Sequence, residues 1–293
     1  MITTRNTVKT MLFMAALGGL LVLIGDWLGS TYNLFGGAAG GMIFFLFIAV
    51  AMNFVSYWWS DKIVLKMTKS RPVTEQEAPW LYRIVRDLTQ KAGLPMPRLY
   101  VMPGSQPNAF ATGRDPHHAA VAVTEGILQV LDENELAGVL AHEISHVKNY
   151  DILIGAVAAT VAAGIMLLAR LAFFADLFGG GGRDRRGGAF SGIFLIILAP
   201  VAAMMIRMAV SRSREAQADA SGAHLYGDAT PLATALIKVD AAAKRTPGLA
   251  VNPAVSHLFL QSPFRADGVA KLFMSHPPLE QRLAQLRELG ARV

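Results

Sequence analysis

"LAGVLAHEISHVKNYD", residues 136–151, sets two histidines and a glutamate into an apolar helical pattern. In an α-helix, His142 and His146 lie one turn apart on the same face, so both imidazoles can bind one ion at the ~2.0 Å typical of zinc–nitrogen bonds. Glu143 lies beside them, where it can take a proton from water that a bound zinc ion has made acidic. The stretch therefore predicts a metal centre built on one helix.

The other interpretation of this stretch is a pair of solvated histidines on a helix surface. Apolar residues recur beside the histidines at helical spacing, and these residues indicate a helix packed against a core: Leu136, Val139, Leu140, Ile144 and Val147. This burial favours the metal centre over the solvated surface. The spacing of the polar residues matches the H-E-x-x-H motif of metalloproteases.

A hydrolytic zinc site needs a third protein ligand and an open fourth position. A histidine six residues after His146 would supply that ligand locally, but Ile152 stands there, which excludes the metzincin pattern. The segment "SRSREAQADASGAHLYG", residues 211–227, offers Glu215 instead, and Asp219 follows one turn later. Asp219 would hold an imidazole N–H and fix the tautomer of that histidine. On spacing alone, Glu215 fits equally well as a surface partner of a neighbouring arginine.

The composition predicts a membrane protein. Hydrophobic residues make up 53% of the 293 residues and charged residues only 16%, whereas soluble domains have roughly a quarter charged residues. The net charge of +6 does not indicate a nucleic-acid partner, because many of the basic residues flank apolar runs instead of gathering on one soluble face. Cysteine is absent, so histidines and carboxylates must hold any metal.

Four apolar runs are candidates for membrane spans. Residues 8–28 and 34–59 each reach the ~20 apolar residues that cross a bilayer. Residues 152–178 and 192–210 form a second pair, separated by the flexible linker "GGGGRDRRGG" at 179–188. We therefore expect a mainly α, α+β protein with a zincin-like domain and about four transmembrane helices.

Basic residues near the spans predict the orientation. Lysines and arginines precede the first run and follow the second, whereas the connection between these runs has none, so the N-terminus and the region after residue 59 should be cytoplasmic. The arginines between the third and fourth runs oppose this arrangement. The expected organisation is a membrane hairpin, a first protease part with HExxH, a second membrane hairpin and a second protease part: residues 1–60, 61–151, 152–210 and 211–293.

The soluble parts carry readable helix and strand signals. "TEQE" at 74–77 has the form of a capping box for a helix that runs to about Lys91 and closes at Gly93. "RLYVM" and "AAVAV" are typical of short strands, and "NAFATG" at 108–113 of an edge strand or loop. Another helix should run from about Glu133 through the motif.

The whole chain resembles the HtpX family of membrane-bound zinc metalloproteases, which is related to the CAAX-prenyl endopeptidases. The matching features are the two N-terminal spans and a series of motifs: "NAFATG", "AAVAVTEGIL", "HEISH", "NYD", "SRSREAQAD" and "SHPPLEQR". The resemblance implies one Zn²⁺ per chain on His142, His146 and Glu215. It also implies Glu143 as the catalytic base and Asp219 as a supporting residue.

The same resemblance implies a multi-pass enzyme of the bacterial inner membrane with its active site on the cytoplasmic side. Such an enzyme cleaves damaged or misassembled membrane proteins as part of protein quality control. Its expected partners are membrane-protein substrates and the lipid bilayer, with no nucleic acid, and the oligomeric state is left open.

Two weaker motifs extend the candidate site. His276 and Arg282 in "SHPPLEQR" match the C-terminal motif of the family, and a donor there could stabilise an oxyanion; alternatively, His276 caps a helix start. Asn108, Ala109 and Phe110 in "NAFATG" resemble the strand to which related proteases add an extended substrate by main-chain hydrogen bonds, or they form a buried turn.

Peptide hydrolysis by zinc-activated water is the function that the sequence favours. One alternative is a CAAX-prenyl-type endopeptidase, which would use the same zinc residues. The other is a non-catalytic membrane chaperone with a structural metal site. A closed structural site needs a fourth protein ligand, and no fourth candidate accompanies the motif.

Overall fold

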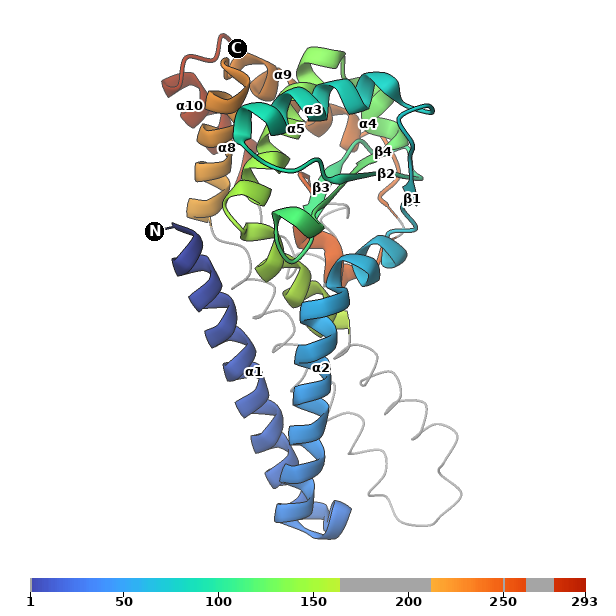
Figure 1. The fold of residues 1–293 in the computed structure, drawn as a ribbon, viewed down its shortest axis with the longest axis vertical. Helices are drawn as coiled ribbons and strands as arrows, with labels where there is room; N and C mark the ends of the chain where they lie inside the picture. Colours follow the sequence, from blue (N-terminus) through green and yellow to red (C-terminus); the bar gives the residue numbers. More distant parts are fainter. Residues whose placement is uncertain (1, 164–211, 250, 262–276) are drawn as a thin grey trace.

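The computed structural model describes residues 2–163, 212–249, 251–261 and 277–293. Two long helices, α1 (Ile2–Tyr32) and α2 (Ala38–Met67), form an antiparallel hairpin that extends from the rest of the protein (Figure 1). Their crossing depends on glycine, because a Cβ atom at Gly25 would lie 2.4 Å from the carbonyl oxygen of Gly41. The hairpin therefore packs backbone against backbone.

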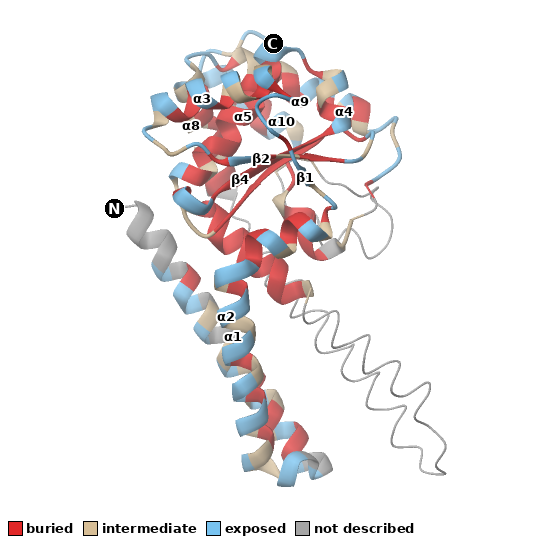
Figure 2. Ribbon diagram, turned by 45° about the vertical axis from the view of Figure 1, so that its right-hand side comes forward, coloured by how far each residue is buried: buried red, intermediate tan, exposed pale blue. Residues whose placement is uncertain are grey.

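The membrane prediction is supported for one helix. Among the described helices, α2 has the length and apolar composition needed to cross a membrane, whereas the apolar part of α1 at residues 18–30 and the helix Asp151–Ala163 are shorter. Figure 2 shows many exposed residues along the hairpin, in contrast to the buried strands above it. Most of the third and fourth predicted spans fall in residues 164–211, which lie outside the described residues.

A four-stranded sheet with the order β1-β2-β4-β3 lies above the hairpin. Strands β2 (Arg98–Met102) and β4 (Ala120–Thr124) are parallel, and β3 (Ala109–Thr112) pairs antiparallel with β4. The two-residue strand β1 (Arg71–Pro72) completes the other edge. The three strands predicted from the sequence are confirmed, and β3 is an edge strand as expected.

The helix predicted after residue 74 begins later than expected. Helix α3 (Pro79–Ala92) starts at a proline, and the Thr74 hydroxyl donates to the Glu77 carboxylate instead of capping backbone N–H groups. Half of the predicted capping box is formed, the half in which the Glu77 carboxylate accepts the backbone N–H of Thr74 at 2.7 Å. The predicted closure is confirmed, since Gly93 adopts a left-handed conformation with φ 68°.

Helix α5 (Glu133–Lys148) carries the H-E-x-x-H motif and crosses the core (Figure 1). A complete capping box starts it, in which Asp132 and Glu135 each accept the backbone N–H of the other. After α5, Tyr150 adopts a left-handed φ of 59°, and helix Asp151–Ala163 follows at once. The short helix α4 (Glu125–Val130) precedes α5.

The C-terminal part of the chain packs on α5. Helix α8 (Arg212–Tyr226) packs against α5 at the motif. The two backbones approach so closely that a Cβ atom at Gly222 would lie 2.9 Å from the His142 backbone. Helices α9 (Thr230–Ala243) and α10 (Leu279–Glu288) and the 3-10 helix η3 (Pro253–Leu258) complete the described fold. One apolar core, built from α3, the sheet, α5 and α9, joins segments from both predicted protease parts.

Candidate metal centre

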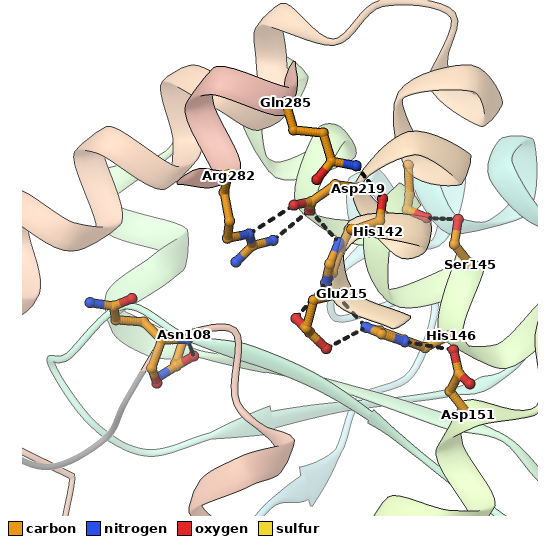
Figure 3. Close-up of polar contacts among 12 residues, drawn as sticks. Asn108, His142, Ser145, His146, Asp151, Glu215, Asp219, Arg282 and Gln285 are labelled. Carbon is orange, nitrogen blue, oxygen red and sulfur yellow. Dashed lines mark hydrogen bonds and ion pairs between the residues drawn. The ribbon is translucent and has the colours of Figure 1, made fainter. Parts of the chain in front are cut away.

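Three side chains converge where helices α5 and α8 pack against each other. The Nε2 atoms of His142 and His146 lie 3.2 Å apart, and the carboxylate of Glu215 lies 3.9 Å from the first and 3.6 Å from the second. One ligand atom from each of the three residues falls within 4.8 Å of the others. Figure 3 shows all three groups pointing toward one another.

These distances fit a metal ion better than a direct contact. Ligand atoms at ~2.0 Å from a tetrahedral ion lie about 3.3 Å from one another, close to the 3.2 and 3.6 Å separations that involve His146. The three residues are largely shielded from solvent, because His142 is 1% and Glu215 7% exposed and the His146 side chain is 15% exposed. Imidazoles and a carboxylate are ligands that zinc accepts, so the donor set fits the metal predicted from the sequence.

An aspartate and an arginine stand on the other side of the His142 ring. The Nδ1 atom of His142 lies 2.9 Å from Oδ1 of Asp219. Arg282 donates two hydrogen bonds to the same carboxylate, at 2.9 Å from Nε and 2.6 Å from Nη2 (Figure 3). Burial raises the pKa of Asp219, but the Arg282 charge and the bonds to His142 and Arg282 outweigh it, so this pKa lies well below its usual value.

The His146 ring also has an acidic neighbour. Its Nδ1–H donates to Oδ2 of Asp151 at 3.2 Å. Burial lowers the pKa of His146, but the bond to Asp151 and the charges of Glu215 and Glu143 outweigh burial and raise this pKa to about 9. In the absence of a metal, the acidic cluster therefore favours the protonated imidazole.

A cavity beside the three ligand candidates is lined by further polar side chains. Glu143 lines it together with Ala111 of β3, Arg214 and His257. His257 is 5% exposed, and its Nε2–H donates to the carbonyl oxygen of Gly155 at 3.0 Å. The 3-10 helix η3 therefore holds His257 against helix Asp151–Ala163.

The predicted substrate residues are buried and already bonded. Asn108, Ala109 and Phe110 are at most 1% exposed. The Asn108 amide accepts from the backbone N–H of Gln261 at 3.0 Å and donates to its carbonyl oxygen at 2.7 Å. The carbonyl oxygen of Ala109 accepts from Leu260 at 3.0 Å. The outer edge of β3 is therefore covered in part by residues 260–261.

The other predicted site residues have different outcomes. Arg282 is 4% exposed and contacts Asp219, as described above. His276 belongs to residues 262–276, outside the described residues, and its role stays a prediction.

A model of peptidase family M48 matches residues 75–290, which include every residue of this centre. The chain belongs to peptidase family M48. A protease HtpX homolog from Pelotomaculum thermopropionicum is 50% identical over 288 residues, which cover 97% of this chain and 99% of the relative. Another from Thermococcus kodakarensis is 50% identical over 284 residues, with 96% and 95% covered. The M48 membership makes this protein a metalloprotease, and it confirms the family that the motifs indicated.

A solved structure, that of Ste24p from S. mikatae, is also similar to this chain. It shares 20% identity at a TM-score of 0.49, covering 97% of this chain and 66% of the other.

The sequence suggests that Asp151 either ends the motif helix or supports a metal ligand, and it offers Arg214 only as a surface partner of Glu215; both residues border the cluster of this M48 site. The only local signal was their position, one at each end of the apolar run 152–210. Their proximity depends on the left-handed Tyr150 and on the packing of α8 against α5, and neither feature is encoded in a local pattern.

Proposed function

We propose that this chain is an integral membrane zinc endopeptidase in which His142, His146 and Glu215 hold one Zn²⁺. The observation that supports this most directly is the convergence of their ligand atoms within 4.8 Å in a buried cluster. Among the described residues, this cluster has three protein ligands, which fits a site with an open fourth position better than a closed structural site.

Glu143 is the proposed general base. It is 3% exposed and lines the same cavity as the three ligand candidates. Zinc bound in this cluster would acidify a water molecule and polarise the scissile carbonyl. Glu143 would take the proton from the attacking water and later pass it to the leaving amine. Asp219, held by Arg282, would keep His142 in the tautomer that presents Nε2 to the ion.

The substrate would bind as an extended strand beside β3. In the antiparallel pair with β4, Asn108 directs its carbonyl toward Thr124, so Ala109 and Ala111 direct theirs to the open edge. Ala111 lines the metal cavity, which places this edge next to the reacting groups. Full strand addition must displace Leu260 from Ala109.

Membrane proteins that are damaged or misassembled are the proposed substrates. Helix α2 ends where the soluble fold begins, and the apolar helix Asp151–Ala163 starts five residues after His146. The centre would therefore lie near a membrane surface, where it could reach segments that leave the bilayer. We place it on the cytoplasmic side of the inner membrane, from the distribution of lysine and arginine around the first two runs.

The test is Glu143→Gln in detergent-purified, zinc-reloaded protein, assayed on an unfolded membrane protein. The variant should keep about one zinc per chain and lose turnover by about 10² to 10⁴-fold, the usual contribution of a general base. Glu125→Gln, at an exposed glutamate of α4, is the matched control and should cleave normally. Equal cleavage by Glu143→Gln and wild type would remove Glu143 from the mechanism.

The chain also allows a direct test of orientation, because it has no cysteine. The cysteine of a Glu125→Cys variant should resist a membrane-impermeant maleimide in intact cells and react after lysis. Labelling of intact cells would place the protease part on the outer side.

A further inference from the structure

Asp151 lies on the side of the His146 ring that faces away from the ligand cluster. The Nδ1 atom of the ring faces Asp151 at 3.2 Å, and the Nε2 atom faces His142 and Glu215. Because the two nitrogens lie on different sides of an imidazole, a carboxylate at Nδ1 leaves Nε2 unprotonated when the ring is neutral. Nε2 is the atom that the proposed zinc site needs.

The turn at Tyr150 produces this contact. Helix α5 ends at Lys148, Tyr150 adopts φ 59°, and Asp151 begins the next helix. A continuous helix would place Asp151 five residues along and off the face of His146. The left-handed residue instead turns the chain, so that the carboxylate points back at the imidazole (Figure 3).

Arg214 is a buried cation that forms an ion pair with this carboxylate. It precedes Glu215 on α8 and is 8% exposed, and its Nε lies 4.0 Å from Oδ1 of Asp151. A buried guanidinium is unfavourable unless a carboxylate faces it, and Asp151 is the carboxylate that an ion pair joins to it among the described residues. Asp151 thus stands between an imidazole and an arginine.

The same order of groups occurs at the other histidine. The Nδ1 atom of His142 faces Asp219, which pairs with Arg282. The Nδ1 atom of His146 faces Asp151, which pairs with Arg214. We propose that Asp151 and Arg214 are positioning residues for His146, with Asp151 orienting the ring for metal and Arg214 holding Asp151. This inference rests on the proposed zinc site.

The arrangement also connects the metal site to the apolar run 152–210, the predicted second membrane hairpin. Asp151 immediately precedes this run, and Arg214 follows it by four residues. The ion pair between Asp151 and Arg214 therefore joins the two ends of this run, and Asp151 also contacts the proposed metal ligand His146. A change in the packing of these two ends would move Asp151 and so alter the orientation of the His146 ring.

Zinc affinity, measured by competition with a chromophoric chelator on the full chain in detergent, tests the proposal. Asp151→Ala should weaken zinc binding by about ten- to a hundredfold, as usual for groups that orient a metal ligand. Asp151→Asn should recover part of the loss, because its amide oxygen still accepts the Nδ1 proton. The visible spectrum of the Co²⁺-loaded protein should change in Asp151→Ala and return toward wild type in Asp151→Asn.

Arg214→Met should weaken binding less than Asp151→Ala, and the double variant should be no weaker than Asp151→Ala, because Arg214 acts through Asp151. Asp61→Ala is the matched control: it removes a carboxylate that is 9% exposed and pairs with Arg98 at 2.6 Å, outside the metal centre. Its zinc affinity should equal that of wild type.

The outcomes separate two levels of failure. Wild-type zinc affinity in Asp151→Ala would overturn this inference and leave the zinc site intact. Fully additive losses in the double variant would overturn the part assigned to Arg214. If Asp151→Ala does not fold, wild-type zinc affinity and an unchanged Co²⁺ spectrum in Asp151→Leu, whose side chain is of similar size but cannot accept the Nδ1 proton, would overturn it equally. Absence of zinc binding by wild type would overturn the proposed function together with this inference.

Discussion

Replacing Arg282 with methionine should destabilise the metal-free protein by about 3–5 kcal/mol, the usual cost of removing one partner from a buried ion pair. The structure supports this magnitude, because Asp219 is fully buried and Arg282 donates two hydrogen bonds to it at 2.6 and 2.9 Å. Two hydrogen bonds to a charged group, at about 1.5–3 kcal/mol each, give a similar sum. Zinc affinity should fall as well, since Asp219 also faces His142.

The direction of the Asp219 pKa shift determines the pH at which stability should be measured. Its pKa is lowered in the folded protein, so the stabilisation is present above the unfolded value of about 3.9 and is lost as the pH falls through the folded value. At pH 7 the whole effect is measured. Thermal unfolding followed by intrinsic fluorescence should show a Tm lower by roughly 6–20 °C, at about 2–4 °C per kcal/mol.

Two further variants identify the cause. Arg282→Lys keeps the charge but cannot make both bonds, so its Tm should be intermediate. Asp219→Asn combined with Arg282→Met removes the buried negative charge and should be more stable than Arg282→Met alone. A Tm of Arg282→Met within about 2 °C of wild type, with unchanged zinc affinity, would refute the assignment of Arg282 as the anchor of Asp219.

Three other predictions concern the centre itself. Glu215→Ala should lower zinc stoichiometry well below one per chain, measured by atomic absorption; full retention would move the third ligand elsewhere. Zinc affinity should rise with pH up to about 9, roughly tenfold per unit, because the metal must displace the proton on His146; a flat profile between pH 7 and about 9 would contradict this. Gly222→Ala should weaken zinc binding, since its Cβ would lie 2.9 Å from His142, whereas Gly19→Ala, with open space around it, should not.

The sequence predicted the parts of the site that are local. His142, Glu143 and His146 lie within one helical turn, so their spacing alone determines that they share a helix and nearly share a face. Spacing alone did not decide whether Glu215 is a metal ligand or a surface partner of an arginine. Its contact with α5 depends on the packing of helices about 70 residues apart in the sequence. Recognition of several motifs together, and not periodicity, favoured it as a ligand.

Two features required the tertiary structure. The contact between His146 and Asp151 depends on a left-handed tyrosine, a conformation that is uncommon for residues other than glycine and has no sequence signal here. The covering of β3 by Gln261 joins residues 153 positions apart, so the expectation of an open edge strand could not include it. In both cases a long-range or strained contact decided what a local pattern left open.

The charges of the centre explain why its residues suit a divalent cation. Six ionisable groups that normally carry charge lie at most 8% exposed around the two histidines: Glu143, Asp151, Arg214, Glu215, Asp219 and Arg282. Four carboxylates and two guanidinium groups leave two net negative charges in a buried volume, where uncompensated charge is costly. A proton on His146, whose pKa is raised to about 9, compensates one of them in metal-free protein at neutral pH. A divalent cation that displaces this proton would compensate both, so each arginine serves the neutrality of the whole cluster as well as the geometry of one histidine.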